Sequence, residues 1–185
     1  MSTAVEAAVS LACHPDTPCE DIRAIDVVVR RTRAELQLIF HLDGRLSRIR
    51  LPPVGAPELW RHTCVELFVG IDGRLAYHEF NFSPSGEWRA FGFHSYRDAL
   101  RSQSQVRSPL VTVNGTKDTI GLNARIALAD LSEVHPFSPL RIGLASVIEL
   151  SDGSFCYWAL RHRPGKPDFH HADGFALRLE VPSLE

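Results

Sequence analysis

The 185-residue sequence has no long apolar run and no excess of positive charge. No apolar stretch approaches the roughly 20 residues of a membrane-spanning helix, so no membrane partner is expected. Lys and Arg number 20 against 22 Asp and Glu, and the resulting net charge of −2 gives no reason to expect a nucleic-acid partner. The sequence also has no HExxH motif, no phosphate-binding loop and no nucleophile elbow.

Cysteine is scarce, with four residues and no CxxC pair. A chain of this length buries roughly 70% of its unfolded surface and does not need disulfides. Cys64 and Cys156 lie in apolar strand patterns and are expected as buried thiols. Cys13 and Cys19 flank His14, where a metal site is one alternative. The N-terminal stretch lacks the basic residues of a secretion signal, so a cytoplasmic protein is expected.

Turn signals recur along the chain, and apolar residues alternate between them. Asp-Gly or Asn-Gly pairs occur at 43–44, 72–73, 114–115 and 152–153, and "SPSG" at 83–86 adds a fifth turn. One alternating set of apolar residues is Leu36, Leu38, Phe40 and Leu42, and another is Ile120, Leu122, Ala124 and Ile126. Helical periodicity is short, limited to "SYRDALRSQ" and "ALADLSEV". This pattern predicts an all-β antiparallel sandwich or barrel, with residues 1–22 as a flexible lead and 23–185 as one domain.

Four predicted strands carry a second face that is unlike a solvated one. It is rich in acids, rings and small residues and poor in Lys and Arg. Because neighbouring strands lie 4.7–4.9 Å apart, we expect these side chains to converge on a concave polar site. Phe91 and Phe93 are expected to point to the core, which leaves Trp88 and His94 on the site face. The expected members of this face are Glu66, Tyr77, Glu79, Asn81, Trp88, His94 and Glu149, with Trp60 nearby.

Three stretches, "LWRHTCVELFVG", "YHEFNFSPSGEWRAFGFHSYR" and "YWALRHRPGKPDFHHADGFALRL", together resemble the bacterial DOMON-like proteins, which are related to the family 9 carbohydrate-binding modules. The "VE-hydrophobic-F" strand of the family matches Val65–Phe68, and its "E-F-N-x-S-P-x-G-x-W" hairpin matches Glu79–Trp88. The resemblance runs from about Ile25 to Leu179. It implies a β-sandwich of about ten strands with a ligand on the concave face of one sheet.

A sugar or similar polyol is the expected small-molecule ligand. Aromatic rings suit the C–H faces of a sugar, and carboxylates or amides suit its hydroxyls. The resemblance implies two tryptophans that clamp the sugar, with Trp88 as one of them. Its partner stays open among Trp60, Tyr96 and Trp158.

Three alternatives to a sugar-binding module remain. The first is a b-type haem site with His62, His78 or His94 as axial ligands, because Met1 is the only methionine. The second is Ca²⁺ on the carboxylates with Asn81. The third is a carboxylate-dependent enzyme that acts on a sugar-like substrate through Glu66 and Glu79.

The segment "RPGKPD" predicts an irregular loop, since two prolines flank Gly165. His162, Asp168, His170 and His171 can gather there, either as zinc ligands or as groups that pin the loop by hydrogen bonds. Arg61, Arg97 and Arg161 are candidate partners for the acids. An arginine on Glu66 or Glu79 would turn the groove into a structural ion-pair network.

Overall fold

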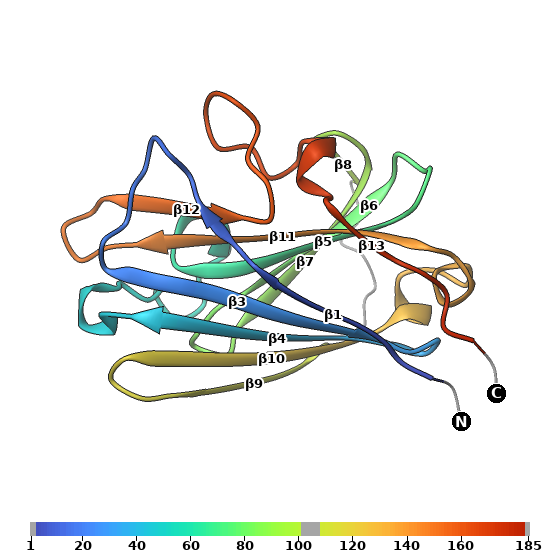
Figure 1. Cartoon of the computed structure of the whole chain (residues 1–185), viewed down its shortest axis with the longest axis horizontal. Coiled ribbons are helices and arrows are strands. Elements are labelled where there is room, and N and C mark those ends of the chain that lie inside the picture. The colour runs from blue at the N-terminus through green and yellow to red at the C-terminus, as the bar shows by residue number, and fades with distance from the viewer. Residues whose placement is uncertain (1–2, 101–107, 184–185) are drawn as a thin grey trace.

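The computed structural model describes residues 3–100 and 108–183, which form two facing antiparallel sheets (Figure 1). The five-stranded sheet has the order β1-β3-β4-β10-β9, and the eight-stranded sheet has the order β2-β12-β11-β5-β6-β7-β8, with β13 also paired to β11. The first sheet consists of β1 (Val5–Ser10), β3 (Ile22–Arg31), β4 (Glu35–Gly44), β10 (Thr119–Ala127) and β9 (Leu110–Gly115). The second consists of β2 (Ala12–Cys13), β12 (Phe155–Ala159), β11 (Leu140–Glu149), β5 (Cys64–Ile71), β6 (Tyr77–Phe82), β7 (Trp88–Ser95), β8 (Asp98–Ala99) and β13 (Leu177–Leu179).

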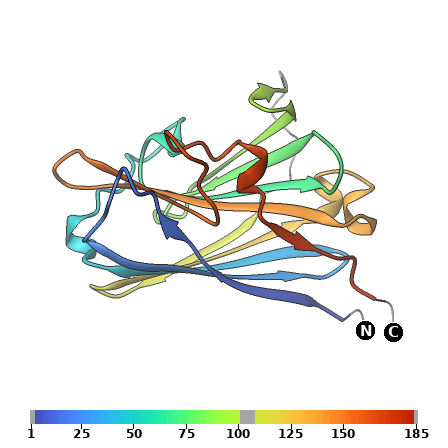
Figure 2. The same cartoon turned by 45° about the horizontal axis from the view of Figure 1, so that its top comes forward.

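The predicted all-β sandwich is confirmed, and Figure 2 shows the two layers of the sandwich. Ten of the strands have five residues or more. The helices are single 3-10 turns: η1 (Leu46–Arg48), η2 (Leu59–Arg61), η3 (Leu128–Asp130), η4 (His135–Phe137) and η5 (Ala172–Gly174). Within the described residues, none of the helices has the length and apolarity to cross a membrane.

The core lies between the sheets, where both present the apolar half of their alternation. In the five-stranded sheet, Leu36, Leu38 and Phe40 of β4 are at most 1% exposed. In the eight-stranded sheet, Leu67 and Phe80 from β5 and β6 are fully buried against them. The outer face of the eight-stranded sheet therefore lies outside the core between the two sheets.

Three of the five predicted turns connect neighbouring strands. Gly73, Gly86 and Gly153 have φ angles between 76° and 89° and lie in the β5–β6, β6–β7 and β11–β12 connections. These values are in the left-handed region that favours glycine. The other two predictions were misplaced, since Gly44 and Gly115 are the last residues of β4 and β9. The β3–β4 turn, at residues 32–34, was not among the predicted turns; there Glu35 N donates to Thr32 Oγ1 (3.0 Å).

The expected flexible lead over residues 1–22 is wrong for much of its length. Strand β1 pairs with β3, and β2 pairs with β12, so this segment contributes to both sheets. Val5, Ala7 and Val9 alternate toward the main core, where they are partly buried. Their small side chains gave a weak apolar signal, and tertiary contacts supply the rest of the stabilisation.

A buried arginine joins the C-terminal segment to the sandwich. Arg31 is fully buried and donates to the carbonyl oxygens of Leu179 (2.8 Å), Glu180 (3.0 Å), His135 (3.3 Å) and Ser138 (2.6 Å). Burial lowers the pKa of this guanidinium, which nevertheless stays charged. Four charge-assisted hydrogen bonds thus offset its desolvation and fix the chain around η4.

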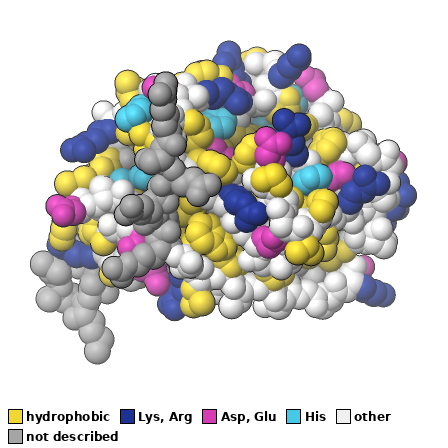
Figure 3. All heavy atoms as spheres, turned by 180° about the vertical axis from the view of Figure 1, so that it is seen from behind, with side chains coloured by type: hydrophobic (Ala, Val, Ile, Leu, Met, Phe, Trp, Pro, Cys, Tyr) yellow, Lys and Arg dark blue, Asp and Glu magenta, His cyan; other side chains and the backbone are white. Residues whose placement is uncertain are grey.

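Figure 3 shows the molecule from behind, where positive and negative side chains are dispersed among neutral and apolar ones. The described part of this face shows no large patch of side chains with a single sign of charge.

We predict that stability falls on acidification because His135 is buried as a neutral ring. Burial and the neighbouring His78 lower the pKa of His135 to about 4. The native state therefore binds fewer protons than the unfolded state between about pH 6.5 and pH 4, and the free energy of unfolding decreases across that window. His135 contributes about 3 kcal/mol at most to this decrease in the free energy of unfolding.

Urea unfolding of wild type and His135→Gln at several pH values measures this contribution, and the stability of the variant should decline less steeply on acidification. His41→Gln, at an exposed position, is the control. Equal slopes for wild type and His135→Gln would contradict the prediction.

Candidate functional site

The outer face of the eight-stranded sheet carries the acids that were predicted from the sequence to share one face. In β5, Val65, Leu67 and Val69 join the main core, and Glu66 faces outward. The register places Glu66 opposite Asn81 of β6 and Ala145 of β11. Directly opposed residues of antiparallel strands share a face. The predicted orientation of these three strands is therefore confirmed.

The predicted orientation of β7 is wrong. Trp88 lies opposite Phe82 and packs on the main core, whereas Phe91 lies opposite Glu79 and faces outward with Phe93. The loop of residues 83–87 sets this register: because Phe82 points to the core, its partner Trp88 must do so too. Trp88 and His94 consequently leave the candidate site, and His94 is exposed at the end of β7.

A cavity of about 420 Å³ opens on this outer face. Its size is within the range of small-molecule sites. One wall comes from the C-terminal loop (residues 160–176), which crosses the outer side of the eight-stranded sheet in Figures 1 and 2. The lining residues are Trp60, Glu66, Glu79, Phe91, Phe93, Arg97, Ala99, Val147, Tyr157, Pro167, Phe169 and His170.

Aromatic rings form two edge-to-face pairs in this lining. Trp60, held by η2, meets Phe91 edge to face with ring centroids 5.2 Å apart. Tyr157 of β12 meets Phe169 of the C-terminal loop in the same manner at 6.1 Å. These rings remain partly exposed, so their apolar surface is available to a ligand.

Two glutamates, which we call the acid pair, lie in the cavity. Glu66 is 2% exposed and Glu79 is 5% exposed. Burial and the charge of Glu79 raise the pKa of Glu66 well above its usual range, and burial raises the pKa of Glu79 as well. Asn81 donates to Glu79 Oε1 (2.7 Å), and the Cys64 thiol donates to Glu66 Oε1 (3.5 Å). No Lys or Arg in the described part of the chain forms an ion pair with either acid.

Tyr77 and His170 form a hydrogen-bonded pair beside Glu79. Burial lowers the pKa of His170 to about 4, with the charge of Arg97 acting in the same direction, so the ring is neutral at pH 7. We infer that His170 Nδ1 accepts from the Tyr77 hydroxyl (2.8 Å), which itself accepts from Arg97 N (3.2 Å). The proton on Nε2 then faces Glu79 Oε2 at 3.6 Å. This contact does not neutralise Glu79, since the imidazole is uncharged.

Arg97 lines the cavity in an unusual backbone conformation. Its φ of 54° is the only positive value among the described non-glycine residues, and such a conformation costs about 1 kcal/mol or more. Its guanidinium donates to Asp168 (2.9 Å), which also accepts from the Tyr96 hydroxyl (2.8 Å). These contacts bind the C-terminal loop to the end of β7. Tyr96 therefore holds the loop, and the predicted clamp role for it finds no support in this geometry.

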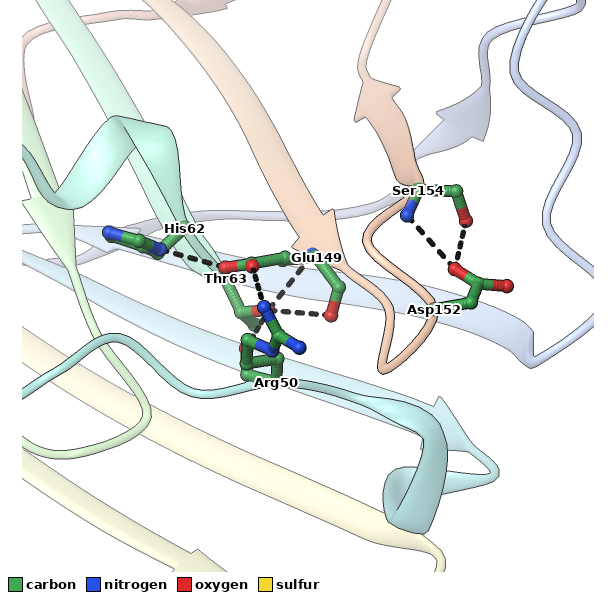
Figure 4. A network of polar contacts seen from close by, with 6 residues as sticks. All are labelled: Arg50, His62, Thr63, Glu149, Asp152 and Ser154. Atoms are coloured by element: carbon green, nitrogen blue, oxygen red, sulfur yellow. Dashed lines mark hydrogen bonds and ion pairs between the residues drawn. The ribbon is translucent and has the colours of Figure 1, made fainter.

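Glu149 shares the outer face but belongs to a separate network (Figure 4). Its carboxylate contacts His62 Nδ1 (2.7 Å) and accepts from Arg50 Nη1 (3.2 Å). The Thr63 hydroxyl donates to Arg50 O (2.7 Å) and accepts from Glu149 N (3.0 Å). Glu149 thus fastens the segment before β5 to β11, and it is absent from the cavity lining.

The histidines named as haem ligands lie in three different surroundings. His78 is on the core face of β6 against His135, His62 contacts Glu149, and His94 is exposed. Near the C-terminal loop, His162 Nε2 contacts Ala12 O (2.8 Å), and His171 caps η5. Among residues 3–100 and 108–183, no three His, Cys, Asp or Glu side chains are grouped to hold a metal ion.

Sequence reasoning missed most of the apolar lining. Phe91 and Phe93 follow from the register of β7, which the core position of Phe82 could have revealed. Tyr157 lies opposite Val147 in the ladder, so its face could be read only once the partner strands were known. Phe169 sits in the irregular loop, where no sequence period indicates a direction. Trp158, a predicted clamp candidate, is 7% exposed and belongs to the main core.

The comparison with known proteins rests on structure. No family model and no curated protein matches the sequence. A presumed carbohydrate-binding protein from Bacteroides uniformis superposes with a TM-score of 0.66 at 15% identity, covering 92% of this chain and 83% of that one. A family 9 carbohydrate-binding module from Caldicellulosiruptor kristjanssonii in complex with cellotriose gives a TM-score of 0.56 at 8% identity, covering 82% of this chain and 72% of that chain. The complex of such a module with glucose gives a TM-score of 0.55 at 8% identity, covering 78% of this chain and 69% of that chain.

These likenesses define the class of fold. The chain is an all-β sandwich, and its architecture is that of the family 9 carbohydrate-binding modules. At identities of 15% and below, the similarity concerns the fold alone. The further resemblance to DOMON-like proteins stays a prediction.

We predict that Glu66→Gln makes stability less dependent on pH on the alkaline side. A raised native pKa means that the folded state keeps a proton that the unfolded state loses, so wild-type stability declines as the pH rises above about 4.5. The variant lacks this share of the decline. Its free energy of unfolding relative to wild type should therefore be higher at pH 8 than at pH 5. Urea titrations at both values measure this, with the exposed Glu133→Gln as control. A constant difference between the two pH values would show that Glu66 ionises normally.

Proposed function

We propose that the protein is a small-molecule binding module whose cavity takes a carbohydrate or similar polyol. The observation that carries this proposal is the cavity itself, which partly exposed rings and two buried acids line together. Trp60, Phe91, Tyr157 and Phe169 offer apolar surface to the C–H faces of a sugar ring. Glu66 and Glu79 offer oxygens to its hydroxyl groups.

The structural neighbours support the same proposal. One of them is a presumed carbohydrate-binding protein, and family 9 modules have been seen with cellotriose and with glucose. A single site with few hydrogen-bonding groups supports a dissociation constant on the order of mM to µM, or about −4 to −8 kcal/mol. A cytoplasmic location remains part of the proposal, and the four free cysteines agree with a reducing compartment.

We expect Trp60→Ala and Trp88→Ala to have opposite effects. Trp60 lines the cavity, so its removal should weaken glucose binding at least tenfold while the Tm changes little. Trp88 packs on the main core, so its removal should lower stability by about 2 kcal/mol while glucose binding persists. Isothermal titration with glucose and thermal unfolding of both variants separate the two roles. Unchanged glucose affinity in Trp60→Ala would remove the cavity as the sugar site.

A second candidate is a carboxylate-dependent enzyme that acts on a sugar-like substrate. The observation in its favour is the raised pKa of Glu66, since a general acid must hold its proton near neutral pH. In that case the protein should release nitrophenol from nitrophenyl glycosides at pH 7. Glu66→Gln should abolish this release, and Glu133→Gln should not. Equal release by wild type and Glu66→Gln would mean that the acid pair only binds.

A further inference from the structure

The cavity contains more negative charge than its own residues compensate. Arg97 is the only Lys or Arg among the described residues that line it. Asp168 engages this guanidinium at 2.9 Å, and Asp168 is itself largely buried. His170, the remaining basic group of the lining, is neutral. The acid pair accepts hydrogen bonds from the Asn81 amide and the Cys64 thiol, which carry no charge. The charge of Arg97 lowers the pKa of both acids, but burial outweighs it and both pKa values stay raised.

Two buried carboxylates without a Lys or Arg ion-pair partner among the described residues are costly in such surroundings. The desolvation of one buried ion costs several kcal/mol, and two neighbouring anions also repel each other. A proton held by the pair relieves part of this cost, in line with the raised pKa values of Glu66 and Glu79. A cation brought by a ligand would relieve it more fully, because it pairs with both acids at once.

The rings around the acid pair are suited to the same ligand charge. Trp60, Phe91, Tyr157 and Phe169 belong to the cavity lining with Glu66 and Glu79. Aromatic faces attract a cation placed within about 6 Å of the ring centre, most strongly where water is excluded. A neutral hydroxyl receives neither this attraction nor the pairing with a carboxylate.

We propose that the ligand carries a protonated amine, which binds between Glu66 and Glu79 beneath the rings of the cavity. This inference rests on the proposed function and narrows it: the ligand class becomes a sugar with a free amino group. An acetylated amine has no charge at neutral pH and falls outside the class. Selectivity between amine and hydroxyl is a property of the acid pair, whereas general sugar affinity is a property of the rings.

The test is isothermal titration at pH 7 with four probes: glucosamine, glucose, N-acetylglucosamine and cyclohexylamine. We expect glucosamine to bind at least tenfold more tightly than glucose and N-acetylglucosamine. Binding should also release a proton, so the apparent enthalpy should differ between phosphate and Tris buffers at the same pH. A ligand that leaves the protonation of the acid pair unchanged would give no such difference.

The four probes separate the inference from the function on which it rests. Equal affinity for glucose and glucosamine overturns the inference and leaves the sugar-binding proposal standing. Binding of cyclohexylamine with no binding of any sugar upholds the amine and overturns the carbohydrate proposal. Absence of binding by all four probes overturns both.

Variants assign the selectivity to the acid pair. Glu66→Gln and Glu79→Gln keep the shape of each side chain and remove its charge, so the ratio of glucosamine to glucose affinity should fall toward one in each. Glu133→Gln changes the net charge by the same amount at an exposed position and should keep the wild-type ratio. Thermal unfolding confirms that each variant is folded before its ratio is compared. A wild-type ratio in both acid-pair variants would overturn the inference.

Discussion

Side chains of a strand alternate between the two faces of a sheet, and this constraint positions the acid pair. In β5 and β6, the apolar set that includes Leu67 and Phe80 is committed to the core. Glu66 and Glu79, which alternate with these apolar residues along each strand, therefore lie on the outer face. A shift of one residue in register would exchange the two sets, which makes such a shift prohibitively costly. The stability of the core thus holds the acid pair in place.

The C-terminal loop converts this outer face into a cavity. Without a cover, the two acids would be hydrated and would titrate normally. Phe169 and His170 bring apolar and neutral surface over them, and the contact between Arg97 and Asp168 fixes the loop on β7. The strained backbone of Arg97 is part of this closure, because its amide must reach the Tyr77 hydroxyl while its guanidinium reaches Asp168. The burial of the acid pair and its raised pKa values therefore have one structural origin, the cover that the C-terminal loop provides.

The hairpin of residues 79–88 has two roles in this chain. Its glutamate, Glu79, lines the cavity, whereas its tryptophan, Trp88, packs on the other face of the sheet against the core. A clamp that includes Trp88 does not fit the register of β7, which places Phe91 beside Glu79 instead. Trp60 reaches the cavity from η2, outside the hairpin. The hairpin therefore supplies an acid to the cavity, and the rings that line the cavity come from other segments.

The alternation in β5, β6 and β11 and the turn glycines were sufficient to predict the sandwich and the outward position of Glu66 and Glu79, because both follow from local geometry. Local geometry was insufficient where pairing decided the face: β7 had apolar residues in both sets, and only its partner β6 determined which set is buried. It was also insufficient for the N-terminal strands, whose small side chains are ordered by their neighbours. Tertiary structure alone brought Tyr157 and Phe169 to the cavity and paired Arg97 with Asp168, which left the acid pair without an ion-pair partner among the described Lys and Arg side chains. Charge compensation and enclosure depend on segments that are distant in sequence.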